Sequence, residues 1–136
     1  MRLFVDSNVF IFANIKDYPE HRIAKEKLMN LIETESRILI NSIIVSEVHY
    51  KLSRLLNPEE AYDRTLKILL SDYVEYLPIG EDTILKAIEL SFLKNMKIND
   101  AIIAQNVLDS GAEGLLTDNV KDFNKISGLK TIEMRS

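Results

Sequence analysis

Four acidic residues in separate parts of the sequence occupy positions from which their carboxylates could act together. They are Asp6, Glu47, Asp100 and Asp118. Asp6 and Asp118 each follow directly after a short apolar run typical of a buried β-strand. Glu47 and Asp100 lie in the first turns of segments with helical periodicity. Carboxylates that share a site raise one another's pKa unless a cation neutralises them. The pattern therefore indicates a site for a divalent metal ion.

The residue types favour Mg²⁺ or Mn²⁺ as that ion. Ligand sets made only of oxygen atoms suit these metals better than Zn²⁺, and the chain has no cysteine and only two histidines to offer instead. One or two such ions would orient a water molecule and lower its pKa; a pair about 3.5–4 Å apart would clamp both oxygens of a phosphoryl displacement. We therefore interpret the acids as the centre of a metal-dependent nuclease.

The elements that must position these acids alternate between short β-branched runs and longer helical segments. This alternation is typical of an α/β fold with a parallel sheet covered by helices. The predicted strands are 3–5, 37–40, 74–77, 114–117 and 130–132, and the predicted helices are 21–33, 42–55, 58–71, 81–95 and 100–110. Asn57 is predicted to cap the third helix and Asn99 the last, which should end at Gly111.

The topology of such a sheet brings the four acids to one edge. Parallel strands all end at the same edge, where ligand sites form. Asp6 and Asp118 follow strands directly. Glu47 lies in the first turns of the helix that follows the second strand, and Asp100 begins a helix that must end at the opposite edge. The convergence requires the first, second and fourth strands to be neighbours, which is an assumption at this point.

Each acid alone also has a purely structural interpretation. Asp6 could be a turn or cap residue, Asp100 could stabilise a helix N-terminus, and Asp118 could be a turn acid. Glu47 is harder to explain in this way, because its helical neighbours are largely apolar and an unpaired carboxylate beside them would be costly. The coincidence of all four favours a common site.

Bulk properties set the class of protein. We expect one domain over residues 1–136, because this length suffices for one core. The net charge of −4 argues against a protein that coats nucleic acid through lysine and arginine, although it does not argue against a metal-dependent nuclease. The absence of cysteine, signal peptide and membrane-length apolar runs fits a cytoplasmic protein.

At these residues the sequence resembles the PIN-domain nucleases, and most closely the compact VapC type that serves as the toxin in toxin–antitoxin pairs. The matching motifs are Val5-Asp6-Ser7-Asn8, Ser46-Glu47-Val48, Ile98-Asn99-Asp100-Ala101-Ile102-Ile103-Ala104 and Leu116-Thr117-Asp118-Asn119-Val120-Lys121-Asp122-Phe123. Each motif is weak alone, but their order and spacing together are specific.

The resemblance implies a three-layer sandwich of helices around a parallel sheet in the order 3-2-1-4-5. It also implies dependence on Mg²⁺ or Mn²⁺, cleavage of single-stranded RNA, a homodimer, and a small antitoxin protein that offers a basic side chain to the acids. The chain has no segment left over to fold back as an inhibitory tail, so we expect the inhibitor to be a separate polypeptide.

Further residues are candidates for the same site. Asp122 either binds metal or braces its loop. Ser7 and Asn8 could hydrogen-bond a metal-bound water or a phosphate oxygen, although helix capping explains them equally well. Thr117 is a candidate for orienting a carboxylate, and Lys121 for contacting phosphate.

Other protein classes fit less well. A haloacid-dehalogenase-like phosphatase needs a second carboxylate two residues after Asp6, where Asn8 stands. A phospho-receiver domain needs an aspartate after the third strand, where Pro78-Ile79-Gly80 stands. Two alternatives stay open: an RNA-processing nuclease without a toxin role, and a nuclease-like binding module that acts through a protein partner.

Overall fold

A five-stranded parallel sheet forms the centre of the protein, as the computed structural model of residues 1–136 shows. The strands are β1 (Arg2–Val5), β2 (Arg37–Ile40), β3 (Val74–Tyr76), β4 (Gly114–Thr117) and β5 (Thr131–Glu133). Their order is β3-β2-β1-β4-β5, and every neighbouring pair is parallel. The expected order 3-2-1-4-5 is therefore confirmed, and the first, second and fourth strands are neighbours.

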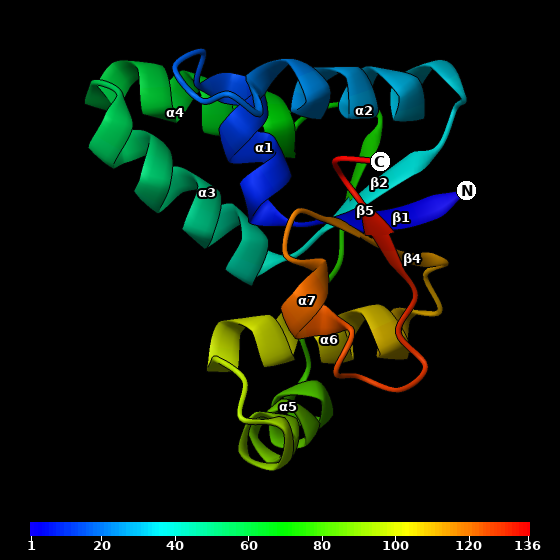
Figure 1. The fold of residues 1–136 in the computed structure, drawn as a ribbon. Helices are drawn as coiled ribbons and strands as arrows, with labels where there is room; N and C mark the ends of the chain where they lie inside the picture. Colours follow the sequence, from blue (N-terminus) through cyan, green and yellow to red (C-terminus); the bar gives the residue numbers. More distant parts are fainter.

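Helices cover both faces of this sheet. They are α1 (Ser7–Asn14), α2 (His21–Glu33), α3 (Ser42–Leu55), α4 (Pro58–Leu69), α5 (Glu81–Lys94), α6 (Ile98–Ser110) and α7 (Val120–Phe123). In Figure 1, α1, α2 and α4 lie together at the top of the view and α5 and α6 at the bottom, with the sheet between them. The predicted α/β sandwich is confirmed. No helix combines the length and the apolar character needed to cross a membrane.

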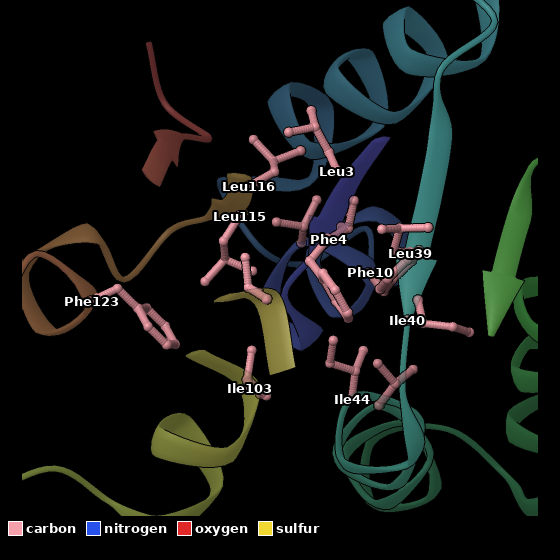
Figure 2. Close-up of a cluster of buried hydrophobic side chains, with 14 of the residues drawn as sticks. Leu3, Phe4, Phe10, Leu39, Ile40, Ile44, Ile103, Leu115, Leu116 and Phe123 are labelled. Carbon is pink, nitrogen blue, oxygen red and sulfur yellow. The ribbon is translucent and has the colours of Figure 1, made fainter. Parts of the chain in front are cut away.

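The core explains why the central strands are apolar on both faces. Figure 2 shows Phe4 of β1 between Leu39 of β2 and Leu115 of β4, with Ile103 of α6 and Phe123 of α7 nearby. All five side chains are fully buried. Strands covered by helices on both faces require continuous apolar runs, and these runs provide most of the favourable free energy of folding.

A buried polar link joins the two helices that carry Glu47 and Asp100. Asn41 caps α3 by accepting a hydrogen bond from the Ile44 amide at 3.0 Å, and its Nδ2 donates to Asn106 Oδ1 of α6 at 2.8 Å. Both asparagine side chains are almost completely buried. Because a buried amide without its partner is costly, this pair fixes the beginning of α3 against the middle of α6.

Several predicted boundaries need correction. The helices α1 and α7 were not predicted, β3 ends one residue earlier than predicted, and β5 is shifted by one residue towards the C-terminus. The prediction that Asn99 caps the last helix is wrong, because α6 begins at Ile98 and its cap residue Lys97 makes no side-chain capping bond. Asn99 lies inside the first turn, where its side chain is free to contact another helix. The predicted end at Gly111 is confirmed, with a φ of 72° that favours glycine.

Candidate active site

Asp6 lies at the carboxyl end of β1 and is held by three neutral donors. Its backbone amide bonds to the Leu116 carbonyl of β4 at 2.9 Å, which fixes it between the two strands. Its carboxylate accepts hydrogen bonds from the Ser7 amide at 2.8 Å, Asn8 Nδ2 at 3.3 Å and the Thr117 hydroxyl at 2.7 Å. Asp6 is also the cap residue of α1. Asp6 can therefore cap α1 and belong to the candidate site at the same time.

The surroundings of Asp6 disfavour its negative charge. Burial raises the pKa of Asp6 to about 6; hydrogen bonds from Thr117 and Ser7 lower it, and the neighbouring charges of Asp100 and Glu47 raise it again. This side chain is only 4% exposed. A carboxyl group with a pKa so far above its usual range lies where a cation would stabilise the ionised form.

Glu47 approaches the same point from the second turn of α3. The Ser7 hydroxyl donates to its Oε1 at 3.0 Å, and Asn99 Nδ2 donates to its Oε2 at 3.4 Å. Ser7 thus belongs to α1 and Asn99 to α6, so that three helices meet at this one carboxylate. Both donors are neutral, and neither compensates the negative charge of Glu47.

Asp100 completes a group of three acids. It lies in the first turn of α6 and is partly buried. Burial raises its pKa, the negative charge of Glu47 raises it further, Lys97 lowers it, and Asp122 raises it. Asp100 therefore lies close enough to both Glu47 and Asp6 for their charges to repel. The structure brings these three acids together, as expected from the strand and helix ends.

Asp118 lies at the carboxyl end of β4 but belongs to a different set of contacts. Both of its carboxylate oxygens accept hydrogen bonds from Arg135: Oδ1 from Nε at 2.6 Å and Oδ2 from Nη2 at 3.0 Å. The same Nη2 donates to Glu20 at 2.7 Å. Asn8 links Asp118 to the other acids, because its Oδ1 accepts from the Asp118 amide at 3.3 Å.

The remaining candidates surround this edge of the sheet. Asp122 accepts a hydrogen bond from Asn119 Nδ2 at 3.1 Å, so it braces its loop, and its charge still reaches Asp100. Thr117 is fully buried, and its hydroxyl also accepts from the Asn119 amide at 2.9 Å. Lys121 is exposed on α7. It is available to a ligand in solution.

The donor set suits a hard divalent cation, although the side chains are not arranged as a complete cage. No group of three or more acidic or histidine side chains is positioned to hold a metal ion as it stands. The chemistry nevertheless fits, because three carboxylates converge, burial and like charge disfavour their ionised forms, and only neutral donors satisfy two of them. Binding of a metal would require side-chain rotation at this edge.

Sequence reasoning did not identify Arg135, Glu20 or the contact made by Asn99. A signal for Arg135 was present, because it follows β5 and the carboxyl end of a parallel strand lies at the same edge as those of β1 and β4. Glu20 immediately precedes α2, which runs back towards the start of β2. The contact between Asn99 and Glu47 depends on helix packing and has no local sequence signal.

Comparison with known proteins gives a family and a fold. A family model described as the PIN domain matches residues 3–129 of this chain. No match is found among curated proteins. Several solved structures are similar over nearly the whole chain.

Three of these structures illustrate the likeness. A chain of VapBC2 from Rickettsia felis, bound to a DNA fragment from its promoter, is 24% identical, with 98% of each chain covered and a TM-score of 0.76. VapBC-1 from nontypeable Haemophilus influenzae is 24% identical over 100% of each chain, with a TM-score of 0.75. Mycobacterium tuberculosis VapC20, described as a Sarcin-Ricin loop cleaving toxin, is 16% identical over 94% of this chain and 96% of that one, with a TM-score of 0.75. At these identities the likeness establishes a shared fold.

The raised pKa of Asp6 predicts a pH dependence of stability in the metal-free protein. Because the pKa of Asp6 is about 6 in the folded state and its usual value is 3.8, the folded state binds a proton more tightly than the unfolded state. The free energy of unfolding should therefore fall as the pH rises from about 4 to about 6, by on the order of 3 kcal/mol from this group. Asp6→Asn removes this dependence, so the variant should gain stability relative to the parent over that range.

Urea denaturation of both proteins in EDTA, between pH 4.5 and 7.5, measures this difference. Asp109→Asn is the matched control: partial burial raises the pKa of Asp109, but hydrogen bonds from Thr83 and Gln105 bring it below its usual value. Asp109 is then ionised in both states, and the difference between this variant and the parent should stay constant. If the difference in the free energy of unfolding between Asp6→Asn and the parent is equally constant, the surroundings of Asp6 do not disfavour its charge as described.

Proposed function

The chain belongs to the PIN domain family, and from this premise we propose that it is a divalent-metal-dependent endoribonuclease and the toxin of a toxin–antitoxin pair. The observation that carries the proposal is the convergence of Asp6, Glu47 and Asp100 at the carboxyl edge of the sheet, where burial and, to a smaller extent, like charges raise the pKa of Asp6 and Asp100. Repulsion between these carboxylates destabilises the folded protein unless a bound cation neutralises them.

The residues that would hold Mg²⁺ or Mn²⁺ are the proposed acids of this edge. They are Asp6, Glu47, Asp100 and Asp118, with Asp122 as a fifth candidate. When bound, the metal supplies a water molecule of lowered pKa and positive charge for the phosphate oxygens. The negative edge of the protein thereby becomes able to accept a polyanion.

The neutral donors around these acids have a defined role in this proposal. Thr117 and Asn8 donate hydrogen bonds to the Asp6 carboxylate, and Ser7 and Asn99 donate to that of Glu47. A hydroxyl or amide donor orients a carboxylate without neutralising it, so the charge stays available to a metal. Loss of such a donor should weaken metal binding without removing a ligand.

RNA is the substrate we propose. Exposed Lys97 and Lys121 border the acids, and Lys97 is close enough to Asp100 to lower its pKa. Ammonium groups in this place can contact the phosphates that flank the cleaved bond. One structurally similar protein, VapC20, is described as cleaving the Sarcin-Ricin loop, which is consistent with RNA as the substrate class. Unpaired RNA would present its backbone to this edge more easily than a duplex.

A small antitoxin protein is the partner we propose. Several structurally similar chains come from VapBC complexes. The chain also has an open groove of about 610 Å³ between α1, α2 and α4, lined by apolar side chains such as Phe10, Leu28 and Ile32 and by charged side chains of α4. A groove of this size and mixed character suits an amphipathic segment of a partner. We propose the cytoplasm as the place where the chain binds this partner and cleaves RNA.

We also propose a homodimer. Helix α5 packs against α6 but exposes apolar side chains on its outer surface, with Leu85 57%, Ile88 54% and Phe92 83% exposed. These residues recur at helical spacing, so they form a continuous stripe. An exposed apolar stripe on a folded chain typically marks an interface, and a second copy would cover it. The mass of the purified protein in solution checks this.

Metal-dependent cleavage by the purified protein is the direct test of the enzyme. EDTA should abolish cleavage of transfer, ribosomal or messenger RNA, and Mg²⁺ or Mn²⁺ should restore it; Ca²⁺ should do so poorly because its geometry is looser. Asp6→Asn and Asp100→Asn should each reduce the rate more than about 100-fold, because each removes a metal ligand. Asp109→Asn, at the other end of α6, should cleave like the parent. Undiminished cleavage in EDTA would eliminate the metal mechanism.

Growth after expression tests the toxin role separately. Expression of the chain alone should arrest growth, and co-expression with a neighbouring small open reading frame should relieve the arrest and yield a complex that does not cleave RNA. An Asp6→Asn chain should be harmless under the same promoter. If the parent is harmless while its purified form cleaves RNA well, the toxin role is wrong and an RNA-processing role replaces it.

A further inference from the structure

Arg135 gives Asp118 a different electrostatic environment from that of the other acids. Its guanidinium contacts both oxygens of Asp118, at 2.6 Å and 3.0 Å, in the bidentate geometry that makes such pairs strong. The Asp118 side chain is 15% exposed and that of Arg135 is 51% exposed, so the pair is partly screened by solvent. Hydrogen bonds to Asp118 and Glu20 raise the pKa of Arg135, which therefore stays charged.

The other acids have no such counter-ion. Asp6 and Glu47 accept hydrogen bonds only from an amide group, hydroxyl groups and carboxamides. Asp100 has Lys97 nearby but forms no ion pair with it within 4.0 Å. A divalent ion that binds these three acids would displace no cation. At Asp118 it would compete for the same carboxylate oxygens and be repelled by the guanidinium.

Glu20 provides an alternative partner for Arg135. It accepts a hydrogen bond from Nη2 at 2.7 Å, its side chain is 16% exposed, and the bond to Arg135 lowers its pKa. The guanidinium can therefore leave Asp118 and remain paired with Glu20. Because the Arg135 side chain is half-exposed, this movement requires no opening of the core.

We propose that Arg135 is an internal competitor of divalent metal for Asp118, so that the chain binds metal first through Asp6, Glu47 and Asp100 and engages Asp118 only when the guanidinium moves away. This inference rests on the proposed metal-dependent function. Arg135 of the same chain thus contacts one of the acids to which a partner protein is also expected to offer a basic side chain.

Titration calorimetry with Mn²⁺ tests the proposal without measuring cleavage. Arg135→Gln should bind Mn²⁺ about three- to tenfold more tightly than the parent, the range expected for the loss of one partly exposed bidentate ion pair. Arg22→Gln removes the same charge from an exposed pair with Glu26 on α2, and should leave the affinity unchanged. Where Arg135→Gln does not fold, Arg135→Lys, which lacks the planar fork, should also bind Mn²⁺ more tightly than the parent.

A double-mutant cycle shows whether the effect passes through Asp118. In an Asp118→Asn background, Arg135→Gln should no longer change the affinity. Unchanged or weaker binding by the Arg135 variant, an equal gain by Arg22→Gln, or a gain that persists without Asp118 would each overturn the inference. If neither the parent nor any variant binds Mn²⁺, the proposed function itself is wrong; if the parent binds and Arg135→Gln binds equally, only the inference fails.

Discussion

The burial of a carboxylate beside two others at one edge of the sheet is the constraint on which the arrangement of this site depends. Asp6 is almost fully buried, and Glu47 and Asp100 are near enough for their charges to raise its pKa. Such a group is costly for a folded protein, because burial and like charge both disfavour ionisation. Neutral hydrogen-bond donors hold Asp6 and Glu47 at this edge without neutralising the charge that a metal would use.

The scaffold resists this repulsion through contacts that cross between elements. The Asp6 amide bonds to β4, so the first acid cannot move away from the sheet. The Asn41–Asn106 pair joins the helices of Glu47 and Asp100 well inside the core. Of the four acids, only Asp118 forms an ion pair, and its partner Arg135 lies in the segment that follows β5. Neutral donors on Asp6 and Glu47 and an exchangeable cationic partner for Asp118 therefore coexist at one edge.

Much of this edge could be predicted from the sequence because strand ends are strong signals. Apolar runs identified the strands, and the rule that parallel strands end at one edge placed Asp6 and Asp118 there before the order was known. The helix α1 was missed because only Asp6 separates its residues Ser7–Asn14 from β1, and α7 because it has only four residues. Contacts between distant side chains, such as Arg135 with Asp118, depend on how the chain packs and leave no periodic pattern. The same limit applies to Asn99, whose role at Glu47 was hidden by its resemblance to a cap.

Anomalous diffraction from crystals soaked in Mn²⁺ near pH 7.5 tests the central claim most directly. We expect a manganese peak bound to the carboxylates of Asp6, Glu47 and Asp100. This peak should be lost from crystals of Asp6→Asn grown in the same way. Manganese bound elsewhere on the surface, with these three carboxylates keeping only their present protein contacts, would contradict the claim that their convergence serves a metal ion.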